Sequence, residues 1–190
     1  MLQSVFVDGH FLDGKKHGVA VLLEKTYEQF ALTNPEVQII VGLERRSTGD
    51  YKFFKMPNVS VVRYRVGGAL RFFVDIPLIA LRYQPDIIHT QYFLPIKLFY
   101  KSLRHVSIHD VLFEDFPQFY SWRYRFPRKI MFRTSAKNAD ILTSISTYSR
   151  ERIQFHYKPE VDIRFFPMGL MSEDLDIGVP SDLAVPNQFL

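Results

Sequence analysis

Short apolar runs alternate with longer segments of helical periodicity along most of this chain, and this alternation constrains the fold more than any other feature. The apolar runs predict strands at residues 4–8, 37–41, 59–64, 87–89, 104–109, 140–143 and 161–164. Helices are expected between them, over residues 18–33, 69–83, 94–101, 122–138 and 147–156. This order of elements is typical of a parallel sheet with helices on both faces. We therefore predict an α/β, Rossmann-like domain.

Length and composition narrow the class of protein. The chain has 190 residues, 47% of them hydrophobic, which is enough for one domain with a full core. It has no cysteine, so disulfides and thiolate metal sites are excluded. No apolar run reaches the roughly 18–20 residues of a membrane-spanning helix, and the first residues do not resemble a signal peptide. We expect a cytoplasmic protein.

Basic residues are concentrated in two places, and the formal net charge is +4. Residues 121–137 contain lysines and arginines but no acidic residue, and residues 63–73 combine arginines with aromatic side chains. Such patches attract phosphates, anionic lipid surfaces or nucleic acid, although a solvated helix face gives the same pattern. No nucleic-acid-binding motif accompanies them. Nucleic acid is therefore not an expected partner, whereas peripheral membrane contact stays open.

The strongest candidate site lies in the segment HVSIHDVLFEDFP, residues 105–117. A strand there carries His109 and Asp110 to its carboxyl end, the edge at which ligands bind in parallel sheets. Neighbouring residues of a strand point to opposite sides, so His109 is the catalytic candidate and Asp110 its support. Histidine serves structure as well as catalysis, and the alternative is that His109 only hydrogen-bonds the next loop. Glu114 and Asp115 are expected as loop acids at the cleft mouth, where they would contact hydroxyl groups of a sugar.

Two further positions lie where a strand leads into a helix. The glycine-rich turn over residues 14–18 ends in Lys16, His17 and Gly18, and the N–H groups of the helix that follows suit a phosphate. The alternative is that the glycine only permits close packing of helix and strand. Ser146 is expected to be an N-cap, and its helix would present a second N-terminus to the same crevice.

His89 ends the segment PDIIH, either lining the cleft or serving as a core histidine with its hydrogen bonds satisfied. The histidines are scattered, and no HExxH motif or pair of carboxylates at ligand spacing is present. The GxGxxG fingerprint, the P-loop and the GxSxG elbow are absent as well. We expect no metal ion.

The ordered set of these segments resembles the N-terminal domain of a family 4 glycosyltransferase of the GT-B fold. Those enzymes commonly have a Pro-Asp strand ending in His, a strand ending in His-Asp, an Ala-Asp strand followed by serine, and a Pro-x-Gly segment before the interdomain linker. The corresponding segments here are PDIIH (85–89), IHD (108–110), ADILTSIS (139–146) and PMGL (167–170). The sequence departs from the usual GG or GIGR turn, since Val19 follows Gly18, and Met168 stands where asparagine is usual.

This resemblance implies retaining transfer of a sugar from a nucleotide donor, such as a UDP- or GDP-sugar, to a glycan or lipid acceptor. His109 would lie near the transferred sugar, and the helix end at Gly18 would face the donor phosphates. The resemblance also implies an acceptor-side domain over residues 1–170, followed by a linker over 171–190 and a missing C-terminal donor-binding domain. This chain alone would then be inactive. A non-catalytic Rossmann-like binding module is the alternative.

Overall fold

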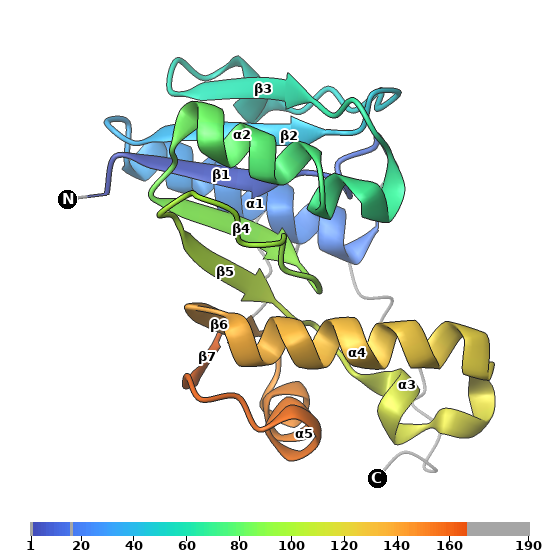
Figure 1. The fold of residues 1–190 in the computed structure, drawn as a ribbon. Helices are drawn as coiled ribbons and strands as arrows, with labels where there is room; N and C mark the ends of the chain where they lie inside the picture. Colours follow the sequence, from blue (N-terminus) through green and yellow to red (C-terminus); the bar gives the residue numbers. More distant parts are fainter. Residues whose placement is uncertain (1, 16, 167–190) are drawn as a thin grey trace, which may run out of the picture.

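The structure, a computed structural model, describes residues 2–15 and 17–166. Within these ranges seven strands form one parallel sheet, in the order β3-β2-β1-β4-β5-β6-β7 (Figure 1). The chain starts in the interior of the sheet, adds two strands on one side and then crosses back to add four on the other. The predicted α/β class with a Rossmann-like parallel sheet is confirmed.

The strands and most of the helices lie close to the predicted positions. The strands are β1 (Ser4–Asp8), β2 (Gln38–Leu43), β3 (Val59–Arg63), β4 (Ile87–Gln91), β5 (Leu103–Ser107), β6 (Ile141–Ser144) and β7 (Ile163–Phe165). The α-helices are α1 (Gly18–Thr33), α2 (Asp75–Tyr83), α3 (Leu112–Asp115), α4 (Trp122–Asn138) and α5 (Thr147–Tyr157). Three short 3₁₀ segments are η1 (Lys52–Lys55), η2 (Gly68–Phe72) and η3 (Pro117–Phe119).

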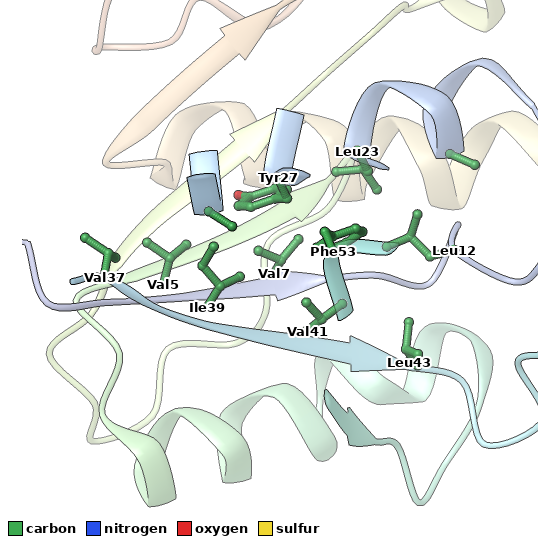
Figure 2. Packing of buried hydrophobic residues seen from close by; sticks show 12 residues of the cluster. Val5, Val7, Leu12, Leu23, Tyr27, Val37, Ile39, Val41, Leu43 and Phe53 are labelled. Carbon is green, nitrogen blue, oxygen red and sulfur yellow. The ribbon is translucent and has the colours of Figure 1, made fainter. Parts of the chain in front are cut away.

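Side chains alternate between the two faces of each strand, so the sheet carries a hydrophobic core on either side. On one face, Val7 and Val41 of the strands pack under α1 (Figure 2). Leu23 and Tyr27 of α1 and Phe53 of η1 belong to the same cluster. The opposite face is covered by α2, α4 and α5, which contribute to two further clusters. The prediction of helices on both faces is confirmed.

The helix predicted to run unbroken to Tyr83 is instead divided into η2 and α2. The division coincides with the buried carboxylate of Asp75, the first residue of α2. Its two oxygens accept hydrogen bonds from the backbone N–H groups of Arg65 and Val66, at distances of 3.1 and 2.9 Å. The aspartate therefore ties the start of α2 to the loop that follows β3, and a continuous helix would not bring it there.

The helix predicted over residues 94–101 is wrong, since this segment is an irregular loop. Its backbone donors are used by neighbouring elements. The N–H of Leu94 bonds the hydroxyl oxygen of Ser135 in α4 at 2.9 Å, and the N–H of Ile96 bonds the carbonyl oxygen of Phe72 at 3.1 Å. Tertiary hydrogen bonds have replaced the local ones that helical periodicity favours.

Because all strands run in one direction, their carboxyl ends meet at a single edge of the sheet. Asp8, Gln91 and Ser107 end β1, β4 and β5 at this edge, and the loops that follow carry the candidate site residues. None of the helices in the described residues combines the length and the apolar character that a membrane span requires.

Candidate active site

His109 lies two residues beyond the end of β5, and only 4% of its surface is exposed. Its Nε2 atom is 2.8 Å from the side-chain carbonyl oxygen of Gln91, so the ring carries its proton on Nε2 and donates it. Burial lowers the pKa of His109 to about 4, which keeps the imidazole neutral at neutral pH. Among the described residues, the other nitrogen, Nδ1, has no hydrogen-bond partner although it is buried.

Gln91 connects His109 to a second histidine. Its side-chain nitrogen lies 3.1 Å from Nε2 of His89, which therefore accepts. The remaining proton of His89 is on Nδ1, which lies 2.6 Å from the hydroxyl oxygen of Tyr27 in α1. Burial, followed by the neighbouring histidines, holds the pKa of His89 well below its usual value. His89 is thus a neutral residue that fixes the orientation of Gln91, which favours a supporting role for it.

The network continues across the sheet into β5 and β6. The hydroxyl oxygen of Ser107 lies 2.8 Å from Nε2 of His89 and 2.7 Å from the hydroxyl oxygen of Thr143, and Thr143 also bonds Nε2 of His105 at 2.9 Å. The rings of His89 and His105 stack, with centroids 4.0 Å apart and an angle of 8° between their planes. Burial lowers the pKa of His105 to about 4. The polar side chains on this sheet face form one connected hydrogen-bond system.

A cavity of about 190 Å³ lies over this polar network, between the sheet and α1. His89, His105 and His109 line it from the sheet, and Leu22, Thr26 and Phe30 line it from the helix. The expected proximity of His89 to His109 is therefore present. Gln91, Ser107 and Thr143 were missed by the sequence analysis. For Gln91 and Ser107 the available signal was spacing, because each lies two positions after a histidine of the same strand and so shares its face, as His89 and Gln91 do in β4 and His105 and Ser107 in β5.

Tyr92, the residue after β4, has an unusual backbone conformation. Its φ of 65° lies in the left-handed region, which a bulky side chain adopts rarely. Its N–H bonds the carbonyl oxygen of Ser107 at 2.9 Å, and its ring packs edge-on against His109, with centroids 5.1 Å apart. The ring centroid of Phe11 lies 6.1 Å from that of Tyr92. Tyr92 therefore connects the loop after β1 with the end of β5.

The N-terminus of α1 lies beside these aromatic rings. His17 is the N-cap, and its Nδ1 accepts a hydrogen bond from the N–H of Ala20 at 3.4 Å. Its ring centroid is 5.5 Å from that of Phe11. A Cβ atom added at Gly18 would meet no atom within 4 Å, so this glycine is not required for close packing. Lys16 lies outside the described residues.

Asp110 faces a different space from His109, as the strand alternation predicts. One of its carboxylate oxygens accepts the N–H of Leu112 at 3.3 Å and so holds the start of α3. Asp110 also lines a second cavity, of about 470 Å³, on the opposite side of the carboxyl edge. Other residues around this cavity are His10, Arg71, Tyr92, Tyr124 and Arg128.

The acidic residues Glu114 and Asp115 do not lie exposed at the cleft mouth as expected. The Glu114 side chain is only 4% exposed, and its carboxylate lies 3.3 Å from both the Tyr157 hydroxyl and the Lys129 ammonium. Asp115 pairs with Arg152 and His156 of α5. Both acids follow β5 into a helix that packs between α4 and α5, where basic partners are available. They hold the helices together instead of facing a ligand.

Ser146 caps α5 as predicted. Its hydroxyl oxygen accepts the N–H of Ser149 at 3.0 Å. The cap lies at the end of β6, and the preceding residue, Ile145, lines the same cavity as His109. The N-terminus of α5 and that of α1 therefore both belong to the carboxyl edge of the sheet.

A buried ion pair at this edge was not anticipated. Asp8, the last residue of β1, accepts hydrogen bonds from Nε and Nη2 of Arg71 and from the hydroxyl of Tyr64, at 2.7–3.2 Å. The Tyr64 ring can reach Asp8 because Gly42 leaves it room; a Cβ atom on Gly42 would overlap the tyrosine hydroxyl. Part of the basic segment 63–73 therefore serves to anchor the cleft wall.

Comparison with known proteins identifies the family. The family model for Glycosyltransferase Family 4 matches residues 17–173, which is most of the chain. This protein belongs to Glycosyltransferase Family 4. The match includes the helix end at Gly18, the His-Asp strand end and the segment around Ser146. The predicted resemblance to a family 4 glycosyltransferase is thereby confirmed, and with it the assignment of the chain as a glycosyltransferase.

A solved structure of sucrose-phosphate synthase from Thermosynechococcus elongatus has the same fold as this family 4 chain. The TM-score is 0.56 at 14% sequence identity, over 91% of this chain and 92% of that one. A search of curated proteins finds no match. The PMGL segment and residues 171–190 lie outside the described residues, so the predicted linker stays a prediction.

Proposed function

We propose that this family 4 chain provides the acceptor-side domain of a retaining glycosyltransferase. The donor is a nucleotide sugar, such as a UDP- or GDP-sugar, and the acceptor is a glycan or a lipid. The family match supports the transfer reaction over the alternative of a non-catalytic binding module. The cysteine-free sequence is compatible with a reducing compartment, and we place the protein in the cytoplasm.

The observation that carries this proposal is the state of His109. The neutral ring of His109 donates a hydrogen bond from Nε2 to the side-chain carbonyl oxygen of Gln91. Its Nδ1 atom is buried and has no partner among the described residues. An unsatisfied buried acceptor costs about 1–3 kcal/mol. A hydroxyl group of the transferred sugar would donate to Nδ1 and remove this cost. His109 would then hold the transferred sugar while positive charge develops on that sugar in the transition state.

The leaving nucleoside diphosphate needs stabilisation of its negative charge. In a helix, the first-turn N–H groups have no partner in the helix itself and point outward, and the dipole adds positive potential. In this proposal the α1 N-terminus at His17 and Gly18 receives the diphosphate, and Lys16 adds charge there. The α5 N-terminus at Ser146 contributes a second positive end. Fixed donors of this kind lower the barrier as charge develops.

The second cavity is the proposed acceptor site. Its wall includes the Asp110 carboxylate, which suits acceptor hydroxyl groups, and the Arg128 guanidinium, which suits a phosphate or carboxylate. We propose that the reaction requires no metal ion. In the described residues, no group of three or more histidines, aspartates and glutamates is arranged to hold one. Transfer should therefore proceed equally well in the presence of EDTA.

The test uses the intact protein and a panel of UDP- and GDP-sugars, with release of nucleoside diphosphate as the first measurement. His109→Ala should lower kcat by about a hundredfold or more, as expected for loss of a group that acts in the transition state. His156→Ala, in α5 and outside both cavities, is the matched control and should retain activity. The anomeric configuration of the early product, read by NMR, tests retention.

Two results would overturn the proposal. Turnover by a folded His109→Ala protein at the rate of the unaltered protein would remove His109 from the reaction. Inversion at the anomeric carbon would contradict the retaining mechanism. If none of the donors is consumed in the presence of glycan and lipid acceptors, the binding-module alternative gains support.

A further inference from the structure

The outer face of α4 carries large apolar side chains that are exposed. Trp122, Phe126 and Ile130 follow one another at intervals of four residues and so lie on one side of the helix, where 71%, 62% and 51% of their surfaces are exposed. Trp122 is the only tryptophan of the sequence. Phe119, in the turn before the helix, is 78% exposed. We call these four residues the apolar stripe; a patch of this kind marks an interaction surface.

Basic side chains share this face. Lys129, Arg133 and Lys137 are also four residues apart, and they extend the surface toward the C-terminus of α4. The Arg123 guanidinium lies 5.6 Å from the centre of the Trp122 ring. Of the residues that the structure describes, neither Arg133 nor Lys137 has an ion-pair partner. Residues 116–138 contain no acidic side chain.

The nearby acids do not cancel this charge. Glu114 is buried and paired with Lys129, and Asp115 is buried and paired with Arg152 and His156. The pKa of Asp115 is lowered by its hydrogen bonds with Arg152 and His156 despite its burial, so this carboxylate stays ionised inside its pair. The exposed surface is therefore apolar at the N-terminal end of α4 and positively charged along the rest.

We propose that α4 docks the protein on the surface of an anionic phospholipid bilayer. Tryptophan and phenylalanine insert at the level of the headgroups, and lysine and arginine bind the lipid phosphates around them. A second copy of this chain fits less well, because two such faces would bring like charges together. At a bilayer, insertion of the aromatic side chains and binding of lipid phosphates by the basic side chains act together. Each interaction holds the helix at the surface and so favours the other.

Docking through α4 would also orient the proposed acceptor cavity. Tyr124 and Arg128, on the other side of the same helix, line that cavity. In Figure 1 the N-terminal end of α4 extends beyond the sheet on the side to which the strands point. A docked protein would therefore present the cavity close to the lipid headgroups. This orientation, unlike the docking itself, rests on the proposed function.

The test measures binding of the intact protein to sedimented vesicles of phosphatidylcholine with phosphatidylglycerol, and to vesicles of phosphatidylcholine alone. We expect binding to the first, weakened by salt, and a shift of Trp122 fluorescence to shorter wavelength. Arg133→Glu with Lys137→Glu should weaken binding at least about 25-fold, since each basic residue near an anionic surface contributes about fivefold. Trp122→Ser with Phe126→Ser should abolish the fluorescence shift and weaken binding about tenfold or more.

The matched control is Leu32→Ser with Lys52→Glu, on α1 and η1 at the opposite face of the sheet, where both side chains are exposed. It should bind vesicles like the unaltered protein. Circular dichroism checks that each variant is folded. Absence of binding to anionic vesicles, or equal binding by the α4 variants and the control, would overturn the proposal. So would dimerisation lost in Trp122→Ser with Phe126→Ser, or tighter binding to single-stranded RNA than to vesicles.

None of these measurements depends on sugar transfer. If the protein binds anionic vesicles but consumes no donor, the docking surface is supported and the proposed function fails. If donors are consumed without any vesicle binding, the reverse holds.

Discussion

Gln91 accepts the Nε2 proton of His109 through its side-chain carbonyl oxygen at 2.8 Å, and its nitrogen is held by His89. A neutral acceptor fixes the tautomer of the imidazole without favouring its protonation. A carboxylate at the same place would raise the pKa of His109, because it would stabilise the charged ring. The amide therefore keeps His109 neutral and its Nδ1 open to a ligand.

Gln91→Leu should lower kcat about tenfold or more, because the His109 ring would lose the bond that orients it. The protein should also lose about 1–3 kcal/mol of stability, since the buried donors and acceptors of His89 and His109 lose a partner. Steady-state rates and urea unfolding check the two effects. Gln38→Leu, at the exposed start of β2, is the control and should change neither.

Gln91→Glu separates orientation from charge. It retains an acceptor for Nε2 of His109 but places a carboxylate beside the ring, so the pKa of His109 should rise from about 4 toward or above its usual value. The pH profile of kcat should then show a new inflection near neutrality. An unchanged profile would mean that Gln91 does not control the protonation of His109.

Stability should fall as the pH drops from about 6.5 toward 4. Burial lowers the pKa values of His105 and His109 to about 4 in the folded protein, whereas an unfolded histidine titrates near 6.5. Between these values the unfolded state binds protons that the folded state does not, so acid favours unfolding. The loss should be on the order of 3 kcal/mol for each histidine.

Urea unfolding midpoints between pH 7.5 and 4.5 measure this slope. His105→Gln retains a side chain able to bond Thr143 and should reduce the slope. Above pH 7 the titration of these histidines should cause no further change of stability with pH. A stability that is flat over the whole interval would contradict the assignment of neutral, buried histidines.

Asp8→Asn should cost about 3–5 kcal/mol of stability, because it leaves the Arg71 guanidinium buried without its counter-charge. The double variant Asp8→Asn with Arg71→Met should lose less than the sum of the single changes. Asp50→Asn removes the partner of Lys55 in an exposed pair and is the control, with an expected loss below about 1 kcal/mol. Equal losses at the two sites would contradict a structural role for the buried pair.

Left-handed backbone positions provide a test of strain. Gln84 and Lys158 end α2 and α5 with φ of 46° and 47°, and both are exposed. Glycine at either position should raise stability by about 1 kcal/mol, because it adopts this conformation without a Cβ clash.

Tyr92→Gly should instead lower stability, since the ring contacts with His109 and Phe11 are lost. Gln154→Gly, inside α5, should cost about 1 kcal/mol.

The parallel sheet and most of the helix positions follow from patterns that the sequence displays. Alternation of apolar strands with helices predicted the parallel sheet, and the serine before a helical run predicted the Ser146 cap. The opposite directions of His109 and Asp110 followed from the geometry of a strand. These features depend on local periodicity or on one residue's hydrogen-bonding chemistry, which neighbouring sequence largely determines.

The features that were missed depend on contacts between distant residues. Gln91 meets His109 because β4 and β5 pair in one register, and Asp8 meets Arg71 across 63 positions of sequence. Glu114 was predicted to be exposed from the polar character of its loop, but Tyr157 and Lys129 enclose it. Helical periodicity over residues 94–101 was overridden by bonds to Ser135 and Phe72. Pairings of this kind arise only when the sheet has assembled.

The parallel sheet has a consequence for how such a protein can diverge. Its packed interior lies along the strands, while the loops over residues 92–101 and 108–121 both leave the sheet at the same end. Changes at positions of these segments that lie outside the buried clusters would alter what the molecule accepts and leave those clusters intact. Natural selection can therefore change substrate choice and fold stability through separate sets of residues, and new specificities can arise without a new scaffold.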